Sequence, residues 1–229
     1  MSGPAHDAMP AAGLSGRGWQ AGVLGGSAAA VDRSAHGREL PTESPVIKLG
    51  GSLLRLPDWP RRARSLVDAV GGGPAIVVGG GAVVDGLRAI DAAAADRSAA
   101  FDAVVHRLAI EAMGITARLV AHALGLPLVE AVPAVAGRQA VVLDVPAWLS
   151  HDDRLAALPA GWHVTSDSIA AVVAAACGRG LLLAKSVPPP PCPDPVLASL
   201  SAAGWVDGFF PTAARHLRVI GWAAPADAS

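Results

Sequence analysis

Short apolar runs rich in β-branched residues alternate along the chain with longer stretches in which apolar residues recur at three- and four-residue steps. The first pattern is typical of buried β-strands, and the second is typical of helices with one apolar face. Strands are predicted at residues 46–49, 75–78, 141–143, 162–164, 181–184 and 217–220. Their alternation with helices predicts an α/β domain built on a largely parallel sheet.

Two of the predicted helices have well-defined sequence signals. The longer one covers residues 101–124, and its predicted buried stripe consists of Phe101, Val104, Val105, Leu108, Ala112, Ile115 and Leu119. The other helix begins near Asp167, because the hydroxyl and carboxylate side chains of residues 165–167 can cap free N–H groups. It is predicted to end at Gly178.

The N-terminal part of the chain differs in composition from the rest. Residues 1–44 are rich in Gly, Ala, Ser and Pro and show no sustained hydrophobic period, which predicts a flexible tail. A folded domain is therefore expected at residues 45–229, and an apolar content of 52% is enough for one closed core.

The charge balance bears on the class of partner. With a formal net charge of -1, the chain has no overall positive field to hold nucleic acid or an anionic membrane, so a small-molecule substrate is expected. Cys177 and Cys192 have neither metal-site nor disulfide-framework spacing, and no apolar run approaches the roughly 20 residues of a membrane span. These features predict a cytoplasmic protein.

The first candidate site follows the strand at residues 46–49. Lys48 lies on that strand, and Gly50, Gly51 and Ser52 form the turn after it. Backbone N–H groups of glycines can approach phosphate oxygens closely because no Cβ intervenes. The pattern fits a phosphate site, although an ordinary strand-to-helix turn fits these residues equally well.

The second candidate site is the triple glycine Gly79-Gly80-Gly81, which leads from a strand into a helix. Successive N–H groups and the positive end of the helix would point at one spot, which favours an anion. Close packing is the alternative role, but it rarely requires the backbone entropy cost of three consecutive glycines. Asp85 and Arg88 lie in the first turns of that helix, and Arg88 either assists the anion site or is a solvated surface residue. The chain has no Walker loop and no complete dinucleotide-binding fingerprint.

The third candidate site combines Asp167 and Lys185. Asp167 opens a helix, where its ordinary role would be capping, and Lys185 ends the apolar strand at residues 181–184. Ligands of parallel α/β sheets bind beside the carboxyl ends of strands, so a lysine there is expected to face a ligand or a carboxylate, and a surface lysine that extends into solvent is the alternative.

Together these segments resemble the amino acid kinase superfamily, which includes acetylglutamate, aspartate, uridylate and isopentenyl phosphate kinases. The resemblance covers residues 45–229. The matching segments are Lys48-Leu49-Gly50-Gly51-Ser52, the turn Gly79-Gly80-Gly81, Thr165-Ser166-Asp167-Ser168 and Ala184-Lys185-Ser186-Val187. The resemblance implies a three-layer α/β/α sandwich of the carbamate kinase-like type.

The resemblance also implies roles for these residues. Lys48 and Lys185 would neutralise the transferring phosphoryl group of ATP, and Asp167 would hold both lysines in place. The turn of Gly50, Gly51 and Ser52 would bind the ATP phosphates, and the triple-glycine turn would bind the acceptor. Magnesium would bridge the ATP phosphates with few protein ligands, and a homo-oligomer would be in keeping with the family.

Within the superfamily, the chain looks like a compact branch that phosphorylates aminomethylfuran-methyl phosphate in methanofuran-type cofactor synthesis, which also serves one-carbon metabolism in some bacteria. The helix segment from His106 to Met113 and the ending at residues 205–211 suggest this branch. His106 then either binds the acceptor or lies on a solvated helix face, and Asp207-Gly208 is either part of the motif or an ordinary turn. A nucleotide or carboxylate acceptor, or a catalytically silent nucleotide- or oxyanion-binding relative, are the alternatives.

Overall fold

The computed structural model describes residue 14 and residues 17–25, 44–95, 98–133, 137, 139–151, 158–191 and 197–227. Cys192 and most of the predicted tail therefore lie outside the described residues. Seven strands form one sheet in the order β1-β7-β6-β2-β3-β5-β4. The strands are β1 (Trp19–Gly25), β2 (Val46–Leu49), β3 (Ala75–Val78), β4 (Leu128–Val129), β5 (Val141–Leu143), β6 (Leu181–Ala184) and β7 (Ile220–Pro225).

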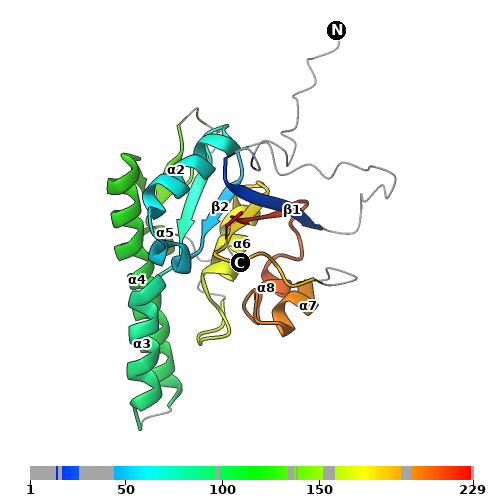
Figure 1. Cartoon of the computed structure of the whole chain (residues 1–229). Helices are drawn as coiled ribbons and strands as arrows, with labels where there is room; N and C mark the ends of the chain where they lie inside the picture. Colours follow the sequence, from blue (N-terminus) through cyan, green and yellow to red (C-terminus); the bar gives the residue numbers. More distant parts are fainter. Residues whose placement is uncertain are drawn as a thin grey trace.

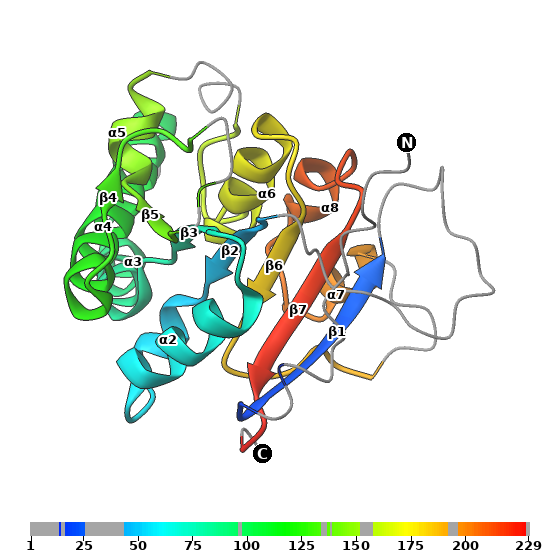
Figure 2. The same ribbon diagram turned by 90° about the horizontal axis from the view of Figure 1, so that it is seen from above.

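Helices cover both faces of the sheet, as Figures 1 and 2 show. They are η1 (Gly51–Arg55), α2 (Trp59–Val70), α3 (Gly81–Ala93), α4 (Ala99–Leu124), α5 (Val145–Leu149), α6 (Ser166–Ala176), α7 (Leu197–Ala202) and α8 (Phe210–Ala213). One buried cluster joins one face of the sheet to α2 and the C-terminal half of α4, and another joins the opposite face to α6, α7 and α8. The expected three-layer α/β/α arrangement is confirmed. In the described part of the chain, no helix is long and apolar enough to span a membrane.

All neighbouring strands run parallel except for the pair β1 and β7. All four residues of β2 pair with β3 on one side and with β6 on the other, and each of these three strands is buried along its length. Their carboxyl ends consequently lie at the same edge of the sheet, where Gly50, Gly79 and Lys185 follow. This shared edge brings together the three turns that the sequence singled out.

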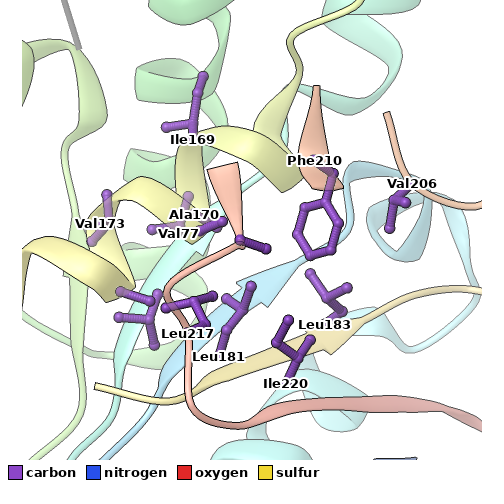
Figure 3. Packing of buried hydrophobic residues seen from close by; sticks show 14 of the residues in the cluster. Val77, Ile169, Ala170, Val173, Leu181, Leu183, Val206, Phe210, Leu217 and Ile220 are labelled. Carbon is purple, nitrogen blue, oxygen red and sulfur yellow. The ribbon is translucent and has the colours of Figure 1, made fainter. Parts of the chain in front are cut away.

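The second half of the core is built around Phe210, which lies between α6 and the strands β6 and β7 (Figure 3). Phe210 is fully buried and belongs to the same cluster as Leu183 and Ile220. The C-terminal segment is therefore part of the main core, and its packing fixes α6 against the sheet.

Residues 17–25 correct the prediction of a tail that extends to residue 44. They include β1, which pairs antiparallel with β7 from Trp19 opposite Pro225 to Gly25 opposite Ile220. Trp19 and Leu24 are buried. This Gly- and Ala-rich segment gains its apolar contacts from a strand about 200 residues away in the sequence, so local composition alone did not predict it.

Two of the six predicted strands are also corrected. Residues 162–164 form a turn in which the N–H of Val164 donates to the carbonyl of Gly161, so this backbone does not join the sheet. The last strand runs over Ile220–Pro225 rather than 217–220, because the N–H of Leu217 closes a turn onto Ala214.

The long helix α4 begins and ends close to its predicted limits, but its buried face differs from the predicted stripe. Val105 and Ala112 are buried as expected, whereas Val104, Leu108, Ile115 and Leu119 are between 42% and 55% exposed. The face that packs on the protein consists largely of small residues, including Gly114, Ala117 and Ala121. A Cβ added at Gly114 would lie 2.9 Å from the side chain of Pro146, so small residues permit the close packing here.

Candidate active site

Two ammonium groups share one carboxylate at the carboxyl end of the sheet. Nζ of Lys48 lies 2.8 Å from Oδ1 of Asp167, and Nζ of Lys185 lies 2.7 Å from Oδ2. The sequence places these groups through alternation along β2, because Ile47 and Leu49 face one layer of helices and Lys48 faces the other. Asp167 lies in the first turn of α6, directly above that face.

Burial and mutual charge control this cluster. Burial acts to raise the pKa of Asp167, but the charges of Lys48 and Lys185 outweigh burial and hold this pKa below its usual value. Burial and the charge of Lys48 lower the pKa of Lys185 to about 8, although Asp167 and Asp207 oppose the shift. Asp167 therefore stays ionised and holds the ammonium groups of Lys48 and Lys185 close to each other.

Lys185 also contacts the C-terminal segment. Its Nζ donates a hydrogen bond to the backbone carbonyl of Trp205 and lies 4.9 Å from the centre of the Trp205 ring. A carbonyl oxygen and the face of an aromatic ring both favour a cation, so these contacts hold the ammonium group of Lys185 on two further sides.

The two glycine turns lie against each other. A Cβ on Gly51 would be 2.2 Å from the backbone N of Gly81, and a Cβ on Gly79 would be 2.8 Å from the backbone N of Gly51. Gly81 also has a φ of +55°, which glycine adopts without strain. Because Gly51 and Gly81 are the first residues of η1 and α3, their N–H groups have no carbonyl one turn earlier within the helix.

Gly50 lies in the predicted turn, but its N–H has a partner that the sequence did not indicate. Its N–H donates to the carbonyl of Ala184 at 2.8 Å, so in this structure the group joins β2 to β6 instead of pointing to a phosphate. The hydroxyls of Ser52 and Ser186 lie 3.0 Å apart and connect the turns after the same two strands.

A cavity of about 230 Å³ opens beside the lysine pair and the glycine turns. Lys48, Gly51 and Ser52 line it on one side. All six residues predicted to bind the acceptor also line it: Gly79, Gly80, Gly81, Asp85, Arg88 and His106. The cavity is not lined by Gly50, Asp167 or Lys185. Asp167 lies behind the cavity wall, where it contacts the lining residue Lys48 on one side and Lys185 on the other.

Trp162 forms a wall of this cavity that sequence reasoning did not identify. Its indole Nε1–H donates to Oδ2 of Asp91 at 2.8 Å, and the guanidinium of Arg88 lies 4.8 Å from the centre of its ring. The neighbouring N–H of Gly161 donates to Nδ1 of His106 at 3.3 Å. Burial lowers the pKa of His106, and a neutral imidazole that accepts at Nδ1 carries its proton on Nε2.

The remaining charged residues of the cavity lie near its mouth. Asp85 is 3.5 Å from Arg55 and 3.8 Å from Arg88, and all three side chains are about half exposed or more. Such exposed ion pairs contribute little to stability, so Arg88 can exchange Asp85 for an anionic ligand at low cost.

Asp207 is another functional candidate that the sequence left open. Its carboxylate accepts hydrogen bonds from the backbone N–H groups of Thr165, Ser168 and Phe209 and from the hydroxyls of Thr165 and Ser168. The sequence allowed Asp207-Gly208 to be part of a motif or an ordinary turn, and it did not indicate these contacts because Thr165 and Ser168 lie about 40 residues away.

Three comparisons with known proteins bear on the family of this chain. No curated protein sequence matches the chain significantly. Among solved structures, the uridylate kinase of Archaeoglobus fulgidus is similar, with 16% sequence identity, a TM-score of 0.49, and coverage of 75% of this chain and 86% of that chain. The model of the amino acid kinase family matches residues 44–189, which contain both lysines, both glycine turns and Asp167. The chain belongs to the amino acid kinase family and is a phosphotransferase.

Proposed function

We propose that the protein transfers the γ-phosphoryl group of ATP to a small molecule that already carries a phosphate. Kinases of this family use ATP and typically Mg²⁺. The observation that carries the proposal is that the chain contains only two lysines, and both contact the same buried carboxylate beside two glycine turns. The other basic residues among the 18 are arginines, so lysine occurs only at this centre.

The cluster suits phosphoryl transfer, which depends mainly on positioning and on neutralising charge. In the proposed reaction an oxygen of the acceptor phosphate forms a bond to the γ-phosphorus of ATP, and the bond from that phosphorus to the leaving oxygen of ADP breaks. Lys48 and Lys185 offset the negative charge on the transferring group. A phosphate oxygen is already anionic at neutral pH, so the acceptor needs no general base.

We propose that the ATP phosphates lie between Gly51, Ser52 and Lys185. Among the described residues there is no group of three or more His, Cys, Asp or Glu side chains placed to bind a metal ion. Asp167, the carboxylate nearest the lysines, is already paired with both of them. Magnesium that enters with ATP would therefore be held mainly by phosphate oxygens, where it would add positive charge.

We propose that the acceptor occupies the cavity, with its phosphate at the turn of Gly79, Gly80 and Gly81. The first N–H groups of α3 and the positive end of this helix favour an anion there, and Arg88 is close enough to assist. The ring of Trp162 and the side chains of Ile110 and Met113 line the rest of the cavity and suit a compact, flat body. Aminomethylfuran-methyl phosphate has both parts and is our first candidate.

The test is an acceptor panel with the purified full chain, ATP and Mg²⁺. Aminomethylfuran-methyl phosphate, the corresponding alcohol, uridine monophosphate and a carboxylate such as acetylglutamate are compared at equal concentrations. ADP release gives the rate, and phosphorus NMR identifies a diphosphate ester as product. We expect turnover with the phosphate ester and little with the alcohol.

The other outcomes of the panel distinguish the alternatives. Equal or faster turnover of the alcohol would contradict the phosphate-acceptor proposal. Preference for uridine monophosphate or for the carboxylate would assign a different acceptor to the same fold. Binding of ATP without turnover of any acceptor would favour the silent relative.

We propose further that the protein acts in the cytoplasm as a homo-oligomer. The location rests on the spacing of Cys177 and Cys192 in the sequence, which fits neither a metal site nor a disulfide framework. The oligomer is supported by the exposed apolar residues of α4, because contiguous exposed apolar surface often marks a contact between proteins.

A further inference from the structure

The carboxylate of Asp207 lies outside the segment that matches the family model, yet it contacts the start of α6 on both sides of Asp167. Oδ2 accepts from the backbone N–H of Thr165 at 3.0 Å, from the Thr165 hydroxyl at 2.8 Å and from the backbone N–H of Ser168 at 3.0 Å. Oδ1 accepts from the Ser168 hydroxyl and from the N–H of Phe209 at 3.1 Å.

These hydrogen bonds do more than an ordinary helix cap requires. Thr165 already caps α6 from its own position, with its side chain accepting from the N–H of Asp167 at 3.5 Å. Asp207 supplies a second, charged acceptor that ties Thr165 and Ser168 to the C-terminal segment. Because Asp167 lies between these two residues, the position of its side chain depends on this tie.

The same C-terminal segment reaches the second lysine. Two residues before Asp207, the carbonyl and the ring of Trp205 contact the ammonium group of Lys185. The segment 205–207 is therefore bound to Asp167 through α6 and to Lys185 directly. Val206 and Phe210 anchor it in the core, so it is a rigid support (Figure 3).

We propose that Asp207 is a positioning residue for phosphoryl transfer, which acts through Thr165 and Ser168 to hold Asp167 in register with Lys48 and Lys185. The inference rests on the proposed role of the two lysines. Asp207 has no place among the residues that line the cavity, so it acts on the reaction through other groups. Its charge has a second effect, because it favours the protonated form of Lys185 against burial and against the charge of Lys48.

The primary test is Asp207→Asn, which keeps the size of the side chain but removes its charge and half of its acceptor capacity. We expect kcat to fall by roughly 10-fold to 10²-fold while KM for ATP changes little, because a small displacement of catalytic groups affects the transition state most. Ser168→Ala removes one hydroxyl donor and keeps the charge, and we expect a smaller fall in kcat. Ser201→Ala removes only the hydrogen bond to the Asp207 backbone carbonyl and should leave kcat unchanged.

A second measurement does not depend on turnover. The chain has only two lysines, so protein labelled with ¹⁵N at lysine Nζ gives two side-chain signals whose titration NMR can follow separately. Groups that face Lys185 are Lys48 on β2, Asp167 on α6 and Asp207 on the C-terminal segment. We expect the midpoint of Lys185 to move to lower pH in Asp207→Asn and to stay in place in Ser201→Ala.

The two measurements separate this inference from the proposed function. If Asp207→Asn and Ser168→Ala both keep wild-type kcat, or if the Lys185 midpoint does not move in Asp207→Asn, Asp207 is only a structural cap and the inference is wrong. If the wild-type protein phosphorylates no acceptor but the Lys185 midpoint moves as expected, the proposed function fails while the positioning of the lysine pair by Asp207 stands. If Asp207→Asn does not fold, Ser168→Ala is the deciding variant. An unchanged kcat in Ser168→Ala contradicts the inference, and a lowered kcat supports it.

Discussion

Lysine and arginine are not equivalent at a phosphoryl-transfer centre. The ammonium group of lysine is a compact point charge. The planar guanidinium of arginine needs a wider site and prefers to bind one carboxylate through two parallel hydrogen bonds. At this centre the two oxygens of Asp167 are shared between two Nζ atoms, which lie 2.7–2.8 Å from them. A bidentate guanidinium would occupy both oxygens at once, as Arg62 does with Asp227. The restriction of lysine to this one centre is consistent with a requirement for chemistry rather than for surface charge.

Replacement of either lysine tests this requirement. We expect Lys48→Ala and Lys185→Ala each to lower kcat by roughly 10²-fold or more, because each removes a charge needed mainly in the transition state. Asp167→Asn should act similarly by releasing both ammonium groups. Each variant also disturbs a buried ion pair and should lose stability, so the assays belong well below its melting temperature. Arg64→Ala on the surface is the control, and near wild-type kcat in either lysine variant would refute the assignment.

The protonation of Lys185 should appear in the pH profile. Burial lowers the pKa of this lysine to about 8, so its charged form is lost as pH rises through that value. We therefore expect kcat/KM for ATP, which reports the free enzyme, to fall above about pH 8 by up to tenfold per pH unit. In Lys185→Arg the side chain stays charged, so the fall should disappear even if the rate is lower. A fall with the same midpoint in that variant would point to another group.

Between elements, the contact of the two glycine turns connects the proposed ATP side to the acceptor side. We expect Gly51→Ala to force the turns apart, because the new Cβ would lie 2.2 Å from the backbone N of Gly81. Turnover should fall by at least about tenfold, with raised KM for both substrates, since positioning errors near 1 Å have such effects.

Gly86→Ala is the matched control for this prediction. Gly86 lies within α3, and a Cβ there meets no atom within 4 Å, so alanine should stabilise the helix by about 0.5–1 kcal/mol without changing kcat. Initial rates and thermal melts on both variants provide the measurement. Wild-type kinetics in Gly51→Ala would show that contact between the turns is not required.

Elements with strong local signals could be predicted from the sequence, and elements that depend on distant contacts could not. The buried strands β2, β3 and β6 were predicted within their observed limits because each is a short run, apolar apart from Lys48 in β2, that is followed by Gly or Lys. The turn at residues 162–164 resembles a strand in sequence, but its backbone groups bond to Gly161 and to Phe209. A local pattern contains no information about such partners.

The residues of the candidate site also fall into those that local motifs predict and those that only distant contacts identify. Lys48, Asp167 and Lys185 occur in recognisable motifs, and the parallel sheet brings them together. Trp162 occurs in no such motif, and the ending that contains Asp207 gave it no defined role. The importance of both residues follows from hydrogen bonds to Asp91 and to the start of α6. Gly50 was predicted as a phosphate donor because glycine composition cannot tell which N–H groups a neighbouring strand already uses.

For the molecule as a whole, β1 closes one edge of the sheet. We expect deletion of residues 1–44 to lower the free energy of unfolding by roughly 3–5 kcal/mol or more, because it removes the buried Trp19 and leaves the edge of β7 unpaired. Urea denaturation of the deletion and of Trp19→Ala measures the loss. Gln20→Ala, which removes one hydrogen bond to Pro225, should cost about 1 kcal/mol. Unchanged stability of the deletion would mean that β1 adds nothing to the domain.

The opposite edge of the molecule presents α4, and there the apolar surface has no partner within the described part of the chain. Val104, Leu108, Ile115 and Leu119 recur at steps of four and seven residues, which places them along one side of α4. Helix α4 itself lies on the side of the molecule away from β1 (Figure 1). If two copies meet by twofold symmetry, each contributes the same stripe, and the contact buries side chains that are now about half exposed.

We expect the wild-type protein to be a dimer or a larger oligomer by light scattering, and we expect Ile115→Glu combined with Leu119→Glu to convert it to a monomer. Val187→Glu is the control, because Val187 is as exposed as Ile115 but lies outside α4. Helix α4 also contributes His106 and Met113 to the cavity, so dissociation should raise KM for the acceptor more than KM for ATP. A wild-type protein that is monomeric at all concentrations, or an oligomer that the double variant leaves intact, would contradict this role for α4.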